Sequence, residues 1–239
     1  MSRQLLMSVD NQQGHGRKAK GEATRRRIVE SAAELFHAQG VDGTGLEQIL
    51  RQAGAGKSQF YQHFRNKGAL VCEVVVWWEH RLFASMEDHE LDSLDTLERW
   101  LLSAIDQLEV EQCYRGCPIG TLAAGLHDND ETTRAAVGQC FRALDSRLRD
   151  ALHQSQQRGE LSEEADLEAI SHFILASQQG AATLTKAYGD SSAGRLVIVQ
   201  AMQYVRSYSV NGQEQSAIAT AKRTPSLSAT TLTKSPLSG

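Results

Sequence analysis

The segment from Leu46 to Leu70, LEQILRQAGAGKSQFYQHFRNKGAL, constrains the fold more than any other part of the chain. Its apolar residues are spaced as in two short helices, which the glycine-bearing turn Ala53–Gly56 separates. Phe60 and Phe64 lie four residues apart in the second helix, so both would pack against a core from one side. Polar side chains fill the positions between them. The pattern predicts a firmly seated helix with a polar outer face, which is what reading of the DNA major groove requires.

The rest of the chain favours helix. Only three prolines occur in 239 residues, and two of them fall in the last fifteen, so long stretches are free of helix breakers. Ala, Leu, Glu, Gln and Arg are abundant, whereas runs rich in Val, Thr and aromatic residues are nearly absent. We therefore expect an all-α protein.

Hydrophobic periodicity and capping residues place the individual helices. Gly40 stands where a C-terminal cap belongs, while Thr44 and Asn66 are expected N-caps of the helices that follow them. The expected helices cover residues 22–39, a short helix around 46–50, and then about 57–64, 66–83, 94–110, 118–125, 132–158, 166–188 and 193–208.

Charge is distributed unevenly along the chain. Residues 1–70 contain 11 Lys and Arg against 6 Asp and Glu, whereas the remainder contains 14 against 23. The basic front part is thus the part expected to meet a polyanion, although chance clustering of solvated charges gives the same numbers.

The four cysteines do not form the spacing of a disulfide framework. No apolar run approaches the length needed to span a bilayer, and no basic-then-apolar leader opens the sequence. We expect a cytoplasmic protein without a membrane partner.

The front part resembles a known family. Thr44, Ile49, Ala53–Gly54, Phe60–Tyr61, His63–Phe64, Asn66–Lys67 and Leu70 reproduce the order T-x-x-x-x-I-x-x-x-A-G, F-Y-x-H-F and N-K-x-x-L. This pattern, over about residues 22–70, is similar to the TetR family of bacterial transcriptional regulators. Beyond residue 80 the resemblance is one of helical layout only. It implies an N-terminal three-helix domain with a helix-turn-helix, followed by a larger helical ligand-binding and dimerisation domain.

Composition and the resemblance together divide the chain into four parts. Residues 1–20 are expected to be a flexible basic arm, 21–66 the helix-turn-helix domain, 67–210 the regulatory and dimerisation domain, and 211–239 a disordered tail rich in Ser, Thr and Ala.

The resemblance also assigns DNA contacts. Phosphates would be bound by Thr44, Tyr61, His63 and Lys67, and the groove would be faced by Lys57, Ser58, Gln59 and Gln62. The chain departs from the family at Gly56, where a capping hydroxyl is usual, and at Gly68, where an acidic residue is common. The basic residues Arg17, Lys18, Lys20 and Arg25–Arg27 would steer the protein to DNA or enter the minor groove, or else form a solvated helix start.

Two further sites follow from the resemblance alone. A homodimer on palindromic operator DNA would pack through Ile170, Ile174, Ala181, Leu184, Val199 and Met202, unless these residues fill the core of one protomer. The cavity for a small-molecule effector that releases the repressor would be lined by Trp77, Trp78, Phe83, Cys113, Cys117, Leu122, Phe141 and Phe173. Each of these is also an ordinary core residue. No cofactor is expected.

Cysteine chemistry offers an alternative switch. Cys117 precedes Pro118, a favoured first helical residue, so its sulfur would lie at a helix N-terminus and could sense electrophiles or oxidants together with Cys113. The alternative is that both cysteines are small buried hydrophobic residues. A metal site from Cys113, Cys117 and His127 lacks a recognised zinc spacing.

Other classes of protein fit less well. Gly54–Ser58 looks like the end of a nucleotide-binding P-loop, but Arg51 stands where that motif needs glycine, and helix rather than strand precedes it. A thiol-dependent enzyme would need a base and an orienting group near Cys117, and no such set is evident. A helical adaptor that binds protein remains open, and salt-sensitive DNA binding would distinguish it from a regulator.

Overall fold

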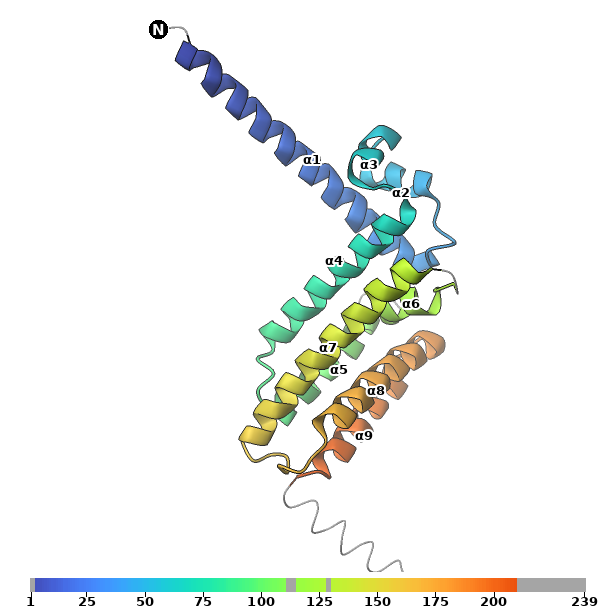
Figure 1. Ribbon diagram of the computed structural model, residues 1–239. Coiled ribbons are helices and arrows are strands. Elements are labelled where there is room, and N and C mark those ends of the chain that lie inside the picture. Colours follow the sequence, from blue (N-terminus) through green and yellow to red (C-terminus); the bar gives the residue numbers. More distant parts are fainter. Residues whose placement is uncertain (1–2, 111–114, 128–129, 210–239) are drawn as a thin grey trace, which may run out of the picture.

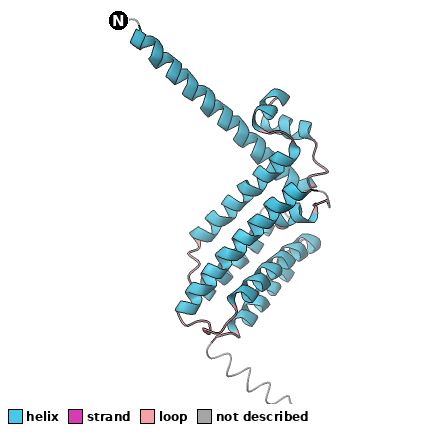
Figure 2. Ribbon diagram, viewed as in Figure 1, coloured by secondary structure: helices cyan, strands magenta, loops and turns pink. Residues whose placement is uncertain are grey.

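The computed structural model describes residues 3–110, 115–127 and 130–209, with side chains described from residue 19 onward except for that of Val110. These residues form helices joined by turns, and no strand occurs among them (Figures 1 and 2). The helices are α1 Arg3–Gln39, α2 Leu46–Ala53, α3 Lys57–His63, α4 Lys67–Asp88, α5 Leu94–Val110, α6 Pro118–Ala124, α7 Glu131–Gln157, α8 Leu167–Tyr188 and α9 Ser192–Arg206. The all-α prediction is confirmed.

The main difference from the expected helices lies at the start of the chain. Helix α1 begins at Arg3 instead of about Glu22, so it includes most of the stretch that the sequence assigned to the basic arm (Figure 1). Residues 3–20 lack an apolar stripe, but they contain no proline, and Gln, Lys, Arg and Leu all tolerate helix well. The predicted tail, residues 211–239, lies outside the described residues.

The turn between α1 and α2 confirms one expected cap and corrects another. Gly40 adopts a left-handed conformation with φ of 74°, as a C-terminal cap requires. Thr44 is not the N-cap of α2, because Gly45 occupies that position. The chain folds back over the end of α1, and the buried Thr44 hydroxyl donates to the Gly40 carbonyl at 2.7 Å. At α4 the prediction holds, since the Asn66 side chain accepts from the backbone N–H of Ala69 at 2.8 Å.

Two clusters of buried apolar side chains hold the helices together. The first cluster combines α1, α2, α3 and the first half of α4 with Ile119 and Leu122 of α6 and Val137 and Cys140 of α7. The predicted domain boundary between residues 66 and 67 falls inside this cluster. Residues of α6 and α7 therefore share one packed core with the helices around α3.

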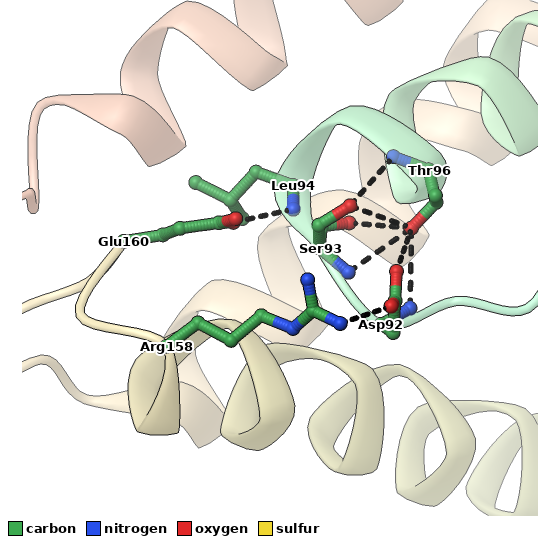
Figure 3. A network of polar contacts seen from close by, with 6 residues as sticks. All are labelled: Asp92, Ser93, Leu94, Thr96, Arg158 and Glu160. Carbon is green, nitrogen blue, oxygen red and sulfur yellow. Dashed lines mark hydrogen bonds and ion pairs between the residues drawn. The ribbon is translucent and has the colours of Figure 1, made fainter.

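The second cluster joins α5, the later part of α7, α8 and α9. A polar network closes its far end (Figure 3). Arg158, just after α7, forms an ion pair with Asp92 in the α4–α5 loop, and Glu160 accepts from the backbone N–H of Leu94 at 2.8 Å. Thr96 accepts from the backbone N–H of Asp92 at 3.1 Å. These contacts tie the loop after α4 to the turn between α7 and α8, far from α3.

Candidate nucleic-acid interface

Helix α3 is anchored by its two phenylalanines. Phe60 is fully buried and Phe64 is 2% exposed, as their spacing predicted. Their ring centres lie 5.4 Å apart within the first cluster, which also contains Phe36 of α1. A helix of this length has few backbone hydrogen bonds of its own, so this packing sets its position.

The start of α3 compensates for the missing capping hydroxyl. Gly56 is the N-cap, in an extended conformation, and it has no side chain to offer. The Gln59 side-chain oxygen accepts from the Gly56 backbone N–H at 2.8 Å, which is the returning half of a capping box. Gln59, predicted to face bases, therefore uses its oxygen within the protein and keeps its amide donors.

The outer face of α3 is polar and exposed. Lys57, Ser58, Tyr61 and Gln62 lie on it, and Tyr61 is 62% exposed despite its aromatic ring. The Lys57 ammonium donates to the Glu47 carboxylate of α2 at 2.8 Å, which raises the pKa of Lys57 and lowers the pKa of Glu47. Both side chains are largely solvated, so a phosphate can replace the carboxylate at little cost.

Two of the expected phosphate contacts have other roles. Thr44 is fully buried, so its hydroxyl is not presented to solvent. The Lys67 ammonium donates to the carbonyls of Val41 and Thr44, at 2.5 and 2.6 Å, and lies 5.8 Å from the centre of the Phe36 ring. Lys67 thereby holds the α1–α2 loop against the start of α4. Sequence spacing could not reveal this, because the loop returns to Lys67 only in three dimensions.

The arginine triplet of α1 is likewise partly occupied. Arg27 donates through Nε to the carbonyl of Ala53 at 3.0 Å, which secures the end of α2 just before the turn into α3. Arg26 points outward with 72% of its side chain exposed, and Lys20 is exposed. The side chains of Arg17 and Lys18 lie outside the described residues. Of the triplet, Arg26 is thus best placed to steer DNA.

Comparison with known proteins agrees with this geometry. Residues 28–74 match the profile of bacterial regulatory proteins, tetR family, and residues 93–201 match the tetracyclin repressor-like C-terminal domain. The chain belongs to the TetR family. It is a DNA-binding transcriptional regulator, and its family is one of regulators and not of enzymes.

Relatives support the assignment along most of the chain. An HTH-type transcriptional regulator in the lacX 3′ region of Lactococcus lactis is 30% identical over 174 residues, which cover 70% of this chain and 85% of that protein. A TetR-family regulator from Agrobacterium tumefaciens has the same fold, with a TM-score of 0.69 at 21% identity, over 77% of this chain and 98% of the other. FadR from Bacillus subtilis, solved in complex with stearoyl-CoA, matches with a TM-score of 0.62 at 15% identity, over 76% and 97% of the two chains.

The described residues among those expected to surround an effector are divided between the two clusters and the surface in this TetR-family regulator. Leu122 belongs to the first cluster, and four others pack against it: Trp77, Trp78, Cys117 and Phe141. Phe83 packs on the second cluster, Phe173 is 39% exposed on α8, and Cys113 lies outside the described residues. Apolar residues at helical spacing mark a buried face, but the spacing does not tell which core they enter.

A groove of about 600 Å³ lies elsewhere, between α1 and α4. Its walls include Arg25, Arg26, Val29, Glu73, Val76 and Trp77. Among the described residues expected to line an effector cavity, Trp77 alone borders this groove.

The expected dimerisation residues lie mostly inside the protomer. Ile170, Ile174, Ala181 and Met202 are buried within one protomer, where α8 and α9 face the second cluster. Leu184 and Val199 are half-buried. The large apolar side chains exposed on these two helices are Phe173, Tyr188, Leu196 and Tyr204. The sequence marked the apolar stripe correctly but not the side that remains uncovered.

Cys117 lies where its neighbour Pro118 predicted, at the N-cap of α6. Its sulfur accepts from the backbone N–H of Gly120 at 3.4 Å and from the Gln179 amide at 3.5 Å. Within the described residues, no three His, Cys, Asp or Glu side chains are grouped so as to hold a metal, and no helix there is long and apolar enough to cross a membrane.

Proposed function

We propose that this TetR-family regulator is a repressor that binds a palindromic operator as a homodimer and leaves it when a small molecule binds. The observation that carries the proposal is the exposed polar face of α3 above the buried Phe60 and Phe64. A helix held this firmly can present side chains to base edges without losing order on binding.

The side chains of α3 divide by chemistry. Ser58, Gln62 and the free amide donors of Gln59 suit base edges, since they offer neutral hydrogen-bonding groups. Lys57, Tyr61 and His63 suit phosphates, which set the register of the helix on the duplex. Thr44 and Lys67 are not included, because their polar atoms are engaged within the protein.

Support for the dimer comes from the outer face of α8 and α9. Phe173 and Tyr204 meet edge to face, with ring centres 4.9 Å apart, and Leu196 is 61% exposed on the same helix as Tyr204. Gly180 and Ala176, also exposed, lie on α8 at helical spacing from Phe173 and would permit close approach of a second copy. An apolar face built of two long helices favours a permanent partner over solvent.

Release by a small molecule would use the first cluster. Two reader helices in a dimer must lie about 34–36 Å apart to enter successive major grooves. The cluster connects α6 and α7 with α3, so an apolar molecule that binds better to a displaced α6 would change this spacing. FadR, which shares the fold, was solved with stearoyl-CoA; the effector proposed here is an apolar organic molecule without further identity.

A cysteine switch at Cys117 is a second candidate. Its sulfur lies at the N-cap of α6 and accepts hydrogen bonds from the backbone N–H of Gly120 and the Gln179 amide. The test is Cys117→Ser, which removes the reactive sulfur but keeps a hydrogen-bond acceptor. If this variant still releases operator when treated with an electrophile such as N-ethylmaleimide, Cys117 is not the switch.

The decisive experiment is selection of bound DNA from a random pool, followed by titration across a salt series. We expect a palindromic sequence, binding that weakens steeply with salt, and two protomers per site. Sequences without two-fold symmetry would contradict the dimeric operator. Absence of salt-sensitive binding to any DNA would contradict the proposed reading by α3.

A further inference from the structure

Arg25 lies where three elements of the DNA-reading part meet. It belongs to α1, and its Nη2 donates to Oε2 of Glu73 on α4 at 2.5 Å. The centre of its guanidinium also lies 5.9 Å from the centre of the Phe64 ring. Phe64 is the C-cap of α3, so one side chain touches the end of the reading helix and the helix that leads to the regulatory part.

The surroundings of this pair make it more than a surface contact. Helices α1 and α4 diverge here (Figure 1). The groove of about 600 Å³ lies between them. Val29 marks the edge of the packed core on α1, whereas Val76 on α4 is 44% exposed. Packing therefore fixes the crossing of the two helices below the groove, and the Arg25–Glu73 pair bridges the open side.

We propose that Arg25 and Glu73 are positioning residues for DNA binding, which hold the angle between α1 and α4 and thereby the orientation of α3. This role rests on the proposed reading of DNA by α3. Arg25 then acts without contacting DNA, in contrast to the steering role that its place in a basic triplet suggests. Arg27 acts beside it, because its bond to the Ala53 carbonyl holds the end of α2 just before the turn into α3.

The proposal predicts an effect of unusual sign at Glu73. Removing a carboxylate from a DNA-binding surface ordinarily strengthens binding, because it lowers repulsion from phosphates. If Glu73 positions α3 through Arg25, Glu73→Gln weakens binding instead. Since the pair is partly solvated, the loss is about fivefold, near the upper limit for an exposed ion pair.

The experiment compares Glu73→Gln, Arg25→Gln and the double variant with the parent protein, on operator DNA selected as above and over a series of salt concentrations. Glu30→Gln is the matched control, since Glu30 forms only a loose pair, 3.8 Å long, with Arg26 of the same helix. Thermal unfolding of each variant checks that the fold is kept. We expect Glu30→Gln to bind as tightly as the parent or slightly more tightly.

The double variant tests whether Arg25 and Glu73 affect DNA binding through each other or independently. If the two residues act through each other, the double variant binds no more weakly than Arg25→Gln alone. The slope of log affinity against log salt stays that of the parent, because no phosphate contact is lost.

Three results would overturn the proposal. They are unchanged or tighter binding by Glu73→Gln, losses that add in the double variant, and a salt slope reduced by about one in Arg25→Gln, which marks a direct phosphate contact. A different result is that the parent protein shows no salt-dependent binding to any DNA. That result would contradict the proposed function itself.

Discussion

The outer faces of α3 and of α8–α9 differ in polarity, although each of these helices packs an apolar side against a core. On α3 the buried side holds the aromatic rings of Phe60 and Phe64, and the exposed side carries hydrogen-bonding groups. On α8 and α9 the buried side is equally apolar, yet the exposed side keeps aromatic and aliphatic groups such as Phe173, Leu196 and Tyr204.

The difference indicates how long each face stays in contact with a partner. Polar groups that are well solvated alone can exchange water for phosphates and bases and then return to water, so their contact is reversible. An apolar face gains free energy by staying covered and gains nothing from release. The polar face of α3 suits DNA, from which a repressor must dissociate. The apolar face of α8–α9 suits a second copy of the chain.

The largest expected effect tests whether α3 depends on its buried side. Phe60→Ala removes a fully buried ring and should lower the free energy of unfolding by about 3–5 kcal/mol. Thermal or urea unfolding measures this, with operator binding lost in parallel. Tyr61→Ala is the control, since that exposed ring should cost no more than about 0.5 kcal/mol. An equal loss of unfolding free energy in both variants would show that the two sides of α3 do not differ as described.

The next effect tests the apolar face of α8–α9. Leu196→Glu places a charge in the proposed interface and should weaken self-association by about thirtyfold, which corresponds to about 2 kcal/mol. Sedimentation equilibrium over a range of concentrations gives the dissociation constant. Val76→Glu is the matched control, because Val76 is also an exposed aliphatic residue but lies on α4. An unchanged constant for Leu196→Glu would place the interface elsewhere.

A smaller effect distinguishes groups within the polar face. Gln62→Ala should cost about 1–3 kcal/mol at particular base pairs of the operator and little at others. Lys57→Ala should weaken binding to all sequences alike and reduce the salt slope by about one. Binding measured on a set of single-base operator variants separates the two patterns. A uniform loss for Gln62→Ala would remove it from base reading.

The smallest effect concerns the carboxylate that Lys57 contacts in the free protein. Glu47→Gln releases Lys57 from its ion pair and should tighten operator binding by about twofold, as expected for a highly solvated pair. The sign is opposite to that predicted for Glu73→Gln, although both changes remove one negative charge. Fluorescence anisotropy with labelled operator measures both, and weaker binding by Glu47→Gln would mean that Glu47 has a positioning role of its own.

Much of the fold could be predicted from the sequence because its signals are local. Proline at the start of α6, asparagine before α4 and glycine after α1 act within one turn of chain, and the helices from α5 to α9 begin and end within two residues of their expected limits. The start of α1 was missed because nothing local marks it. Residues 3–20 have no apolar face, and their helix simply extends one that is already formed.

The site was predictable in part, and the structure gives two of the predicted phosphate-binding side chains partners within the protein for one shared reason. The outward direction of Lys57, Ser58 and Gln62 follows from their spacing around Phe60 and Phe64, which is a local property. Thr44 and Lys67 were assigned to DNA, but each bonds to a carbonyl that the chain brings near by folding back.

By itself the sequence determined the helices, their apolar stripes and the family, since these depend on neighbours a few residues away. Only the tertiary structure decided which stripe remains uncovered on α8 and α9, and which basic groups face solvent. It also decided that Arg25 reaches Glu73, 48 residues further along the chain, across an open groove. Such pairings depend on the angle between packed helices, and no periodicity within a single helix encodes that angle.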